Sequence, residues 1–87
     1  MISSVIRERW GMPRGLIKAT AYYNNVAAWQ DWGAIAAQAE AAGLGDAVAS
    51  AKPETGAGYR RVDKAIGKLR AAMMAAGVTA APLPSSL

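Results

Sequence analysis

Cysteine, histidine and phenylalanine are all absent from this chain of 87 residues. Without cysteine there is no disulfide, and without cysteine or histidine the common zinc sites are excluded. The same absences remove the usual thiol nucleophile and the usual general base near neutral pH. The six carboxylates are scattered, and their spacing indicates no acid–base pair. We therefore expect no enzyme, no bound metal and no cofactor.

Long hydrophobic runs are missing as well. No run approaches the roughly 20 apolar residues that a membrane-spanning helix needs. The first ten residues carry Arg7, Glu8 and Arg9, where a signal peptide would have its apolar core. We expect no membrane span and no secretory signal, which fits a location in the cytoplasm or in a virion.

Large apolar side chains are few, although 53% of the residues are hydrophobic. Of these 46 residues, 21 are alanine, which favours helix but buries little area. A short chain with a thin core has marginal stability unless disulfides, metals or association help. With the first two excluded, a protein partner or a homo-oligomer becomes the expected source of support.

The strongest pattern in the chain is an amphipathic helix over residues 58–77. At about 100° per residue, its large apolar side chains fall within a sector of roughly 80°. Four basic side chains fall within a second sector of roughly 100° on the other side. The apolar set is Tyr59, Val62, Ile66, Leu69 and Met73, and the basic set is Arg60, Arg61, Lys64 and Lys68. The pattern predicts one buried face and one positively charged face.

The basic face has three interpretations: it contacts water, the phosphates of a nucleic acid, or an acidic protein surface. Gly56-Ala57-Gly58 precedes the helix, and free amides at a helix N-terminus attract anions. Asparagine and glutamine are absent from the helix, and no compact helix-turn-helix precedes it. Any nucleic acid would therefore be bound through its phosphates and not read by sequence.

The rest of the chain also reads as helix. Ser3 and Ser4 are candidate caps for a short helix that is expected to run to about Trp10. Pro13 then starts a second helix, and Asn24-Asn25 favours a break before a third helix that ends at Ala42. A single helix from Pro13 to Ala42 is the alternative. Gly43 suits the residue after that helix, and Gly77 the residue after the last one.

The middle of the chain is expected to hold one more short helix and a loop. Asp46 is a candidate cap for a single helical turn that runs to Ala51. Residues 52–58 read as a loop on the evidence of Pro53 and two glycines. Thr55 is a candidate cap for the basic helix.

The last ten residues, 78–87, cannot continue a helix, because Pro82 and Pro84 prevent it. We expect an extended tail that, where ordered, lies against its own domain or a neighbour. Residues 1–77 would then form a single helical domain. The predicted fold is all-α: a small bundle of three to four short helices, with an extended proline-containing C-terminal tail and no sheet.

Three tryptophans supply much of the aromatic area. Trp29 and Trp32 lie three residues apart on one helical face, and Trp10 lies in the N-terminal segment. Each is a core anchor or an aromatic anchor at an interface with a partner. We retain all three as candidate interface residues.

Charge is divided into three blocks, although the whole chain has a net charge of +4. Residues 1–25 carry +3, residues 26–51 carry −3 and residues 52–87 carry +4. The acidic block can neutralise the basic blocks within one chain, or it can join copies head to tail. The acidic segment 26–51 is thus a candidate neighbour for the basic helix.

These features favour a small, non-enzymatic structural or assembly subunit that acts through protein–protein contacts, of the kind found in phage virions or as accessory proteins. Two alternatives remain open. One is a small basic nucleic-acid-binding protein that uses the 58–77 helix. The other is a small inhibitor of a host protein.

Overall fold

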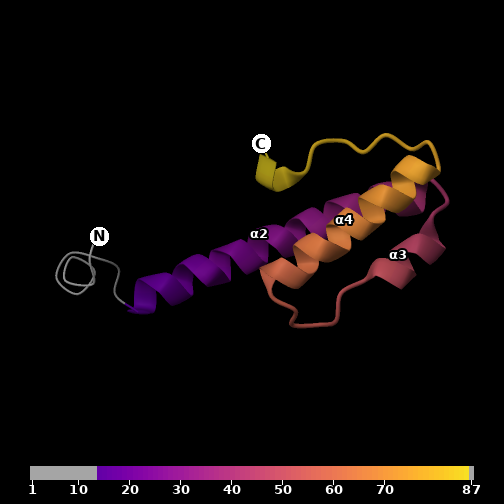
Figure 1. Cartoon of the computed structure of the whole chain (residues 1–87). Coiled ribbons are helices and arrows are strands. Elements are labelled where there is room, and N and C mark those ends of the chain that lie inside the picture. Colours follow the sequence, from indigo (N-terminus) through magenta and orange to yellow (C-terminus); the bar gives the residue numbers. More distant parts are fainter. Residues whose placement is uncertain (1–13, 87) are drawn as a thin grey trace.

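The computed structural model describes residues 14–86, and the side chains of residues 23–85. Its elements are the helices α2 (Arg14–Ala41), α3 (Gly45–Ala51) and α4 (Tyr59–Ala75) and the short 3-10 helix η1 (Pro84–Ser86) (Figure 1). No strand occurs within residues 14–86, so a helical fold is confirmed for that range. The helix predicted to end at Trp10 lies outside the described residues.

Helix α2 is one continuous helix of 28 residues. The break predicted at Asn24-Asn25 is therefore wrong, and so is the expectation that every helix is short. Asn25 does not cap its own helix, because its Oδ1 accepts a hydrogen bond from the Tyr59 amide at 2.7 Å. An asparagine inside a helix costs at most about 0.7 kcal/mol relative to alanine. That cost is small enough for the helix to continue through it.

Both long helices end as predicted, on a glycine in the left-handed region. Gly43 has a φ of 83° and Gly77 has a φ of 74°. After α4, the Val78 amide donates to the Met73 carbonyl oxygen at 2.9 Å. The Gly77 amide donates to Met74 at 3.0 Å, and the equivalent two bonds follow α2. This pair of bonds is the Schellman motif, which satisfies carbonyls that a helix end would leave free.

Neither predicted side-chain cap in the middle of the chain forms. Helix α3 begins at Gly45, and Asp46 lies in its first turn without a capping hydrogen bond. Helix α4 begins at Tyr59 after an extended Gly58, so the predicted cap Thr55 lies too early in the chain. The acceptor for the first amide of α4 comes from Asn25 on another helix, which removes the need for a local cap.

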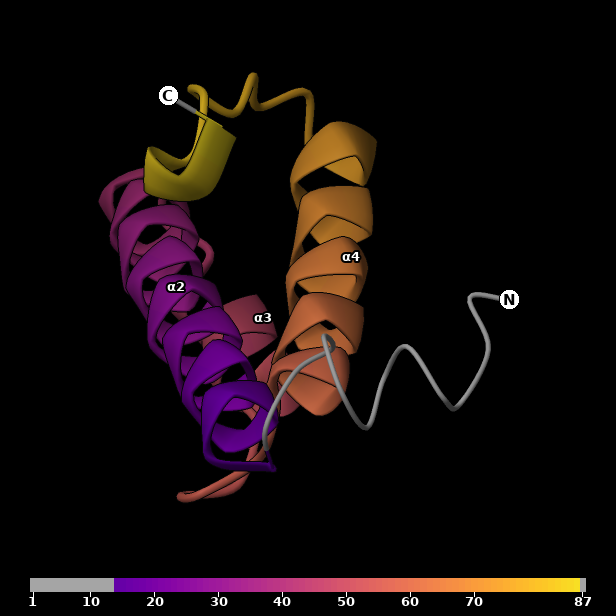
Figure 2. The same ribbon diagram turned by 90° about the vertical axis from the view of Figure 1, so that its left-hand side faces the viewer.

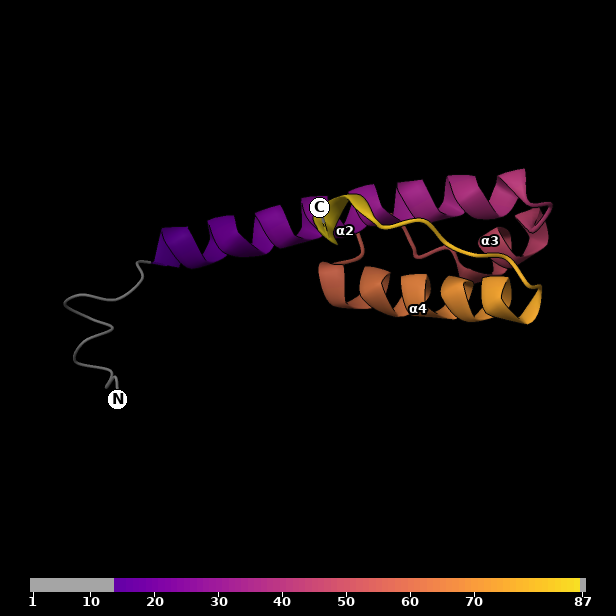
Figure 3. The same ribbon diagram turned by 90° about the horizontal axis from the view of Figure 1, so that it is seen from above.

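Helices α2 and α4 lie side by side and run in the same direction (Figures 1 and 3). The segment formed by α3 and residues 52–58 returns the chain from the end of α2 to the level of Asn25. From that level both helices continue for 17 residues, or about 26 Å at 1.5 Å per residue. They therefore end at the same level, whereas residues 14–24 of α2 project beyond α4 (Figure 3).

The core forms along the seam between these two helices. Its buried residues in α2 are Ala28, Trp32, Ile35 and Ala39, and those at the same spacing in α4 are Val62, Ile66, Leu69 and Met73. The two sets are offset by 34 residues, the same separation as between Asn25 and Tyr59. The helices thus pack in register, with Ala28 level with Val62 and Ala39 level with Met73. Ile35 and Leu69 are fully buried at the middle of the seam.

The predicted buried face of α4 is confirmed with one exception, since Tyr59 is only half-buried. The opposite face is exposed, as expected for Arg60, Arg61, Lys64 and Lys68. Val48 and Ala51 of α3 and Ala57 of the loop complete the core on one side of the seam.

The C-terminal segment closes the other side of the seam (Figure 2). It runs back along α2, where the Ala81 amide donates to Gln38 Oε1 at 2.8 Å. Leu83 is buried, and the Ser85 amide donates to Asp31 Oδ1 at 2.9 Å. The Ser85 hydroxyl donates to Asp31 Oδ2. The segment lies against its own chain, and it ends in η1, so it is not extended throughout as predicted.

Candidate functional site

A groove of about 420 Å³ opens between α3, the 52–58 loop and α4, on the side away from the C-terminal segment. Its apolar lining comes from all three elements and its charged lining from α4 and the loop. The apolar residues are Ala51, Pro53, Ala57 and Ala65, and the charged residues are Glu54, Arg61, Lys64 and Lys68. The groove therefore combines an apolar floor of small side chains with a mostly basic rim.

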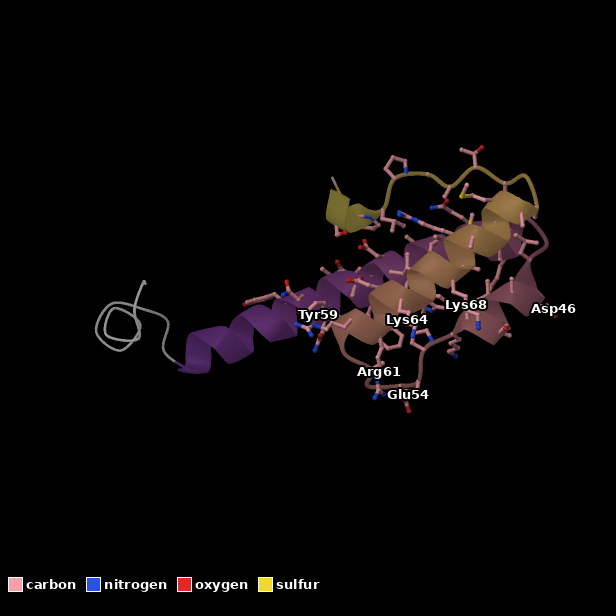
Figure 4. All side chains as sticks on the ribbon, in the orientation of Figure 1. Asp46, Glu54, Tyr59, Arg61, Lys64 and Lys68 are labelled. Atoms are coloured by element: carbon pink, nitrogen blue, oxygen red, sulfur yellow. The ribbon has the colours of Figure 1, made fainter. Side chains whose placement is uncertain are left out.

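The basic rim follows from helical spacing. Arg61, Lys64 and Lys68 are separated by three and four residues, which places them along one side of α4 (Figure 4). Ala65 lies between them and is buried, so it joins the floor. Three of the four basic residues singled out from the sequence are brought together in this way.

Arg61 is held by the loop opposite. Its guanidinium pairs with the Glu54 carboxylate at 2.5 Å, although both side chains are 72% exposed. An exposed pair of this kind contributes at most about 1 kcal/mol to stability, and salt screens it. Its main effect is to fix Arg61 and Glu54 at one end of the groove.

Lys64 and Lys68 have no such partner. The Arg61–Glu54 pair is the only ion pair among residues 23–85. Both lysines are exposed on the groove rim, where each ammonium has three donors for an incoming acceptor. The groove thus carries two unpaired cations and one arginine already shared with a carboxylate.

Arg60 does not line the groove. Its guanidinium carbon lies 5.8 Å from the centre of the Tyr59 ring, and its Nε donates to the Tyr59 hydroxyl at 3.3 Å. The hydrogen bond to Tyr59 raises the pKa of Arg60 above its usual value. The predicted basic face therefore divides, with Arg60 on one side and the three groove residues on the other.

The anion site considered at the start of α4 is partly occupied. The Tyr59 amide is bonded to Asn25 Oδ1, and the Arg61 and Val62 amides each lie 3.1 Å from the Gly58 carbonyl oxygen. Few amides at this helix start remain for a phosphate. The glycine loop instead serves to bring α4 against α2, with Gly56 at a φ of 85°.

The two described tryptophans have different surroundings. Trp32 is buried in the seam between α2 and α4, where it acts as a core anchor. Trp29 is half-buried, and its indole N–H donates to the Ala57 carbonyl oxygen at 2.9 Å. Trp29 also lines a second hollow with Val26 and Gly56, and Ala57 lines both this hollow and the groove. Trp10, Arg7 and Arg9 lie outside the described residues.

The acidic segment 26–51 does not neutralise the basic helix within the described part of the chain. Asp31 is buried and accepts both its hydrogen bonds from Ser85. Glu40 and Asp46 are exposed, and no ion pair holds either of them among residues 23–85. The carboxylate that reaches α4 is Glu54, which belongs to the basic block.

The described side chains include no group of three or more acidic residues placed to hold a metal ion. None of the helices described is both long and apolar enough to cross a membrane.

No known protein family, curated protein or solved structure matches this chain. The site must therefore be interpreted from its own residues. Sequence reasoning found the cations but missed the apolar floor, because Ala51, Pro53 and Ala57 look like ordinary loop and helix-end residues. Pro53, eight positions before Arg61 and between Ala51 and Ala57 in the sequence, is the only trace of the floor.

Proposed function

We propose that this chain is a small non-enzymatic interaction subunit whose groove binds an acidic segment of a partner protein. The groove carries this proposal: apolar side chains form its floor, and three cations and one carboxylate form its rim. A segment with small apolar side chains on one face and carboxylates beside them matches both features. This is the role of an assembly or accessory subunit, in the cytoplasm or in a virion.

The floor favours a protein over a nucleic acid. Phosphate contacts need cations and polar donors, whereas a floor of alanine and proline gains free energy only by covering apolar surface. Binding of a nucleic acid in place of a protein is one outcome of the test below.

The test is a titration of the full chain with an amphipathic acidic peptide, in which isothermal calorimetry or tryptophan fluorescence measures the binding. We expect binding that weakens as salt rises. The variant Lys64→Gln with Lys68→Gln should weaken it by about tenfold, as two surface charge pairs of about 0.5–1 kcal/mol would.

The matched control is Arg60→Gln with Arg70→Gln. It removes the same charge from exposed positions of the same helix outside the groove, and should leave the affinity within about twofold. Equal losses in the two variants would show that net charge, not the groove, attracts the peptide. Tighter binding of duplex or single-stranded DNA than of the peptide would favour the nucleic-acid reading instead.

A further inference from the structure

The end of the molecule at which α2 and α4 both terminate is acidic. Glu40 lies in the last turn of α2. Asp46, labelled in Figure 4, lies in α3 just beyond it. Both are exposed and without an ion pair among the described side chains. We call this surface the acidic end.

The parallel packing of the helices adds to this charge. A helix C-terminus carries a partial negative charge of about half an elementary charge. Because α2 and α4 run in the same direction, both such charges lie at the acidic end (Figure 3). Neither helix has a basic residue in its last turn to offset them. The start of α3 offsets one of them only in part, since that helix has seven residues.

The molecule therefore presents two unsatisfied surfaces of opposite charge. The groove on its flank holds Lys64 and Lys68, and the acidic end holds Glu40 and Asp46. We infer that the occupant of the groove is the acidic end of a second copy of this chain, so that copies join head to tail. This inference rests on the function proposed above, and it names the partner.

The contact would be between two different surfaces. After a single contact, one copy keeps a free acidic end and the other a free groove, so further copies can add as a filament or a ring unless the pair also makes the reciprocal contact. A chain with a thin core would also gain stability, because association supplies burial that the monomer lacks.

The experiment measures the mass of the full chain by light scattering after size exclusion, over a range of protein concentrations. We expect the mass to rise with concentration at about 0.01 M salt, where the Debye length is about 30 Å. It should fall to that of a monomer at about 1 M salt, where the Debye length is about 3 Å.

Two variants that remove the charges of one surface each test whether the groove pairs with the acidic end. One changes the groove, Lys64→Gln with Lys68→Gln, and the other changes the acidic end, Glu40→Gln with Asp46→Asn. Each alone should remain a monomer at concentrations where the natural chain associates. An equal mixture should form dimers and stop there, because only one intact groove and one intact acidic end can meet. Circular dichroism of each variant confirms that it is folded.

Three results would overturn the inference. The natural chain could stay a monomer at low salt, either variant could associate as the natural chain does, or the mixture could fail to form dimers. If the natural chain stays a monomer but binds the acidic peptide, head-to-tail assembly fails and the proposed function stands. If it does neither, both fail.

Discussion

Asn25 shows how a single residue can be recognised by type and still be assigned the wrong partner. Asparagine is a common helix cap, and the sequence places one in the middle of a long helical stretch. The structure uses the same acceptor on the amide of Tyr59, 34 residues later. Sequence spacing reports only local partners, so a cap supplied from another helix could not be read from it.

Replacing Asn25 with alanine should destabilise the protein by about 1 kcal/mol, the usual cost of losing a helix cap. The gain in helix propensity within α2 offsets part of that loss. Equilibrium unfolding in urea would measure the difference. Asn24→Ala is the control, because Asn24 is an exposed neighbour in the same helix, and its replacement should be neutral or slightly stabilising. Equal effects at both positions would mean that the bond to Tyr59 contributes nothing.

Asp31 gives a second example at this scale. In the sequence it belongs to the acidic block, and the block alone suggested a partner of positive charge. In the structure it is buried and bonded to Ser85, 54 residues away. The pattern of charges was read correctly, but the role of this residue depended on the path of the C-terminal segment.

At the scale of elements, the sequence predicts ends and faces well. The amphipathic face of α4 and the glycines after α2 and α4 are found where local patterns place them, because both depend on nearby residues. The start of α4 and the C-terminal segment depend on distant contacts, and these were the elements predicted less well. The turn η1 forms where the Ser85 amide donates to Asp31 Oδ1.

Two glycines of the last helical segment should respond to alanine in opposite directions. Gly77→Ala should cost about 1 kcal/mol or more, because the Schellman motif holds this residue at a φ of 74°. Gly67→Ala should stabilise by up to about 1 kcal/mol, since Gly67 is exposed inside α4 and an added methyl group meets no atom within 4 Å. Thermal unfolding of both variants gives the signs directly. Two changes of the same sign would contradict the assigned end of α4.

The C-terminal segment should loosen before the helices do. Ser85→Ala removes the hydroxyl that donates to Asp31 and leaves the amide bond in place, so we expect a loss of about 1 kcal/mol. Hydrogen exchange should show faster exchange of the Ala81 and Ser85 amides than in the natural chain. Thr79→Ala, at an exposed position of the same segment, should change neither quantity. Unchanged exchange in Ser85→Ala would show that the serine hydroxyl does not hold the segment.

At the scale of the whole molecule, the pairing of α2 with α4 uses a pattern that the sequence contains. The buried residues of the two helices repeat the same spacing at an offset of 34 residues, so the two stripes match position by position. The return of the chain through α3 and residues 52–58, and the bond between Asn25 and Tyr59, set the parallel direction. The repeat was not recognised, because alanines at two of the four α2 positions conceal the stripe. The groove followed from this packing, since α3 and the loop lie where the chain returns to begin α4. Only the charges on its rim were visible in advance.

A core this narrow concentrates stability in a few side chains. Leu69 is fully buried at the middle of the seam, so Leu69→Ala should cost about 2–5 kcal/mol. A chain of this length has a total of only about 4–13 kcal/mol at typical values per residue. We therefore expect the melting temperature to fall by at least about 10 °C. Met74→Ala, in the same helix but 78% exposed, should leave it nearly unchanged.

Unfolding measurements on Leu69→Ala also separate the stability supplied by the core of one chain from the stability supplied by contacts between copies. Measured at about 1 M salt, where head-to-tail contacts are screened, the loss in Leu69→Ala reports the seam of a single chain. A loss below about 1 kcal/mol there would show that the seam is not the main source of stability. The stability of the natural chain at low salt could instead increase with protein concentration. That result would show that contacts between copies supply the rest of the stability. The stability of the variant Lys64→Gln with Lys68→Gln should not depend on protein concentration, because the variant weakens the contact between copies and leaves the core unchanged.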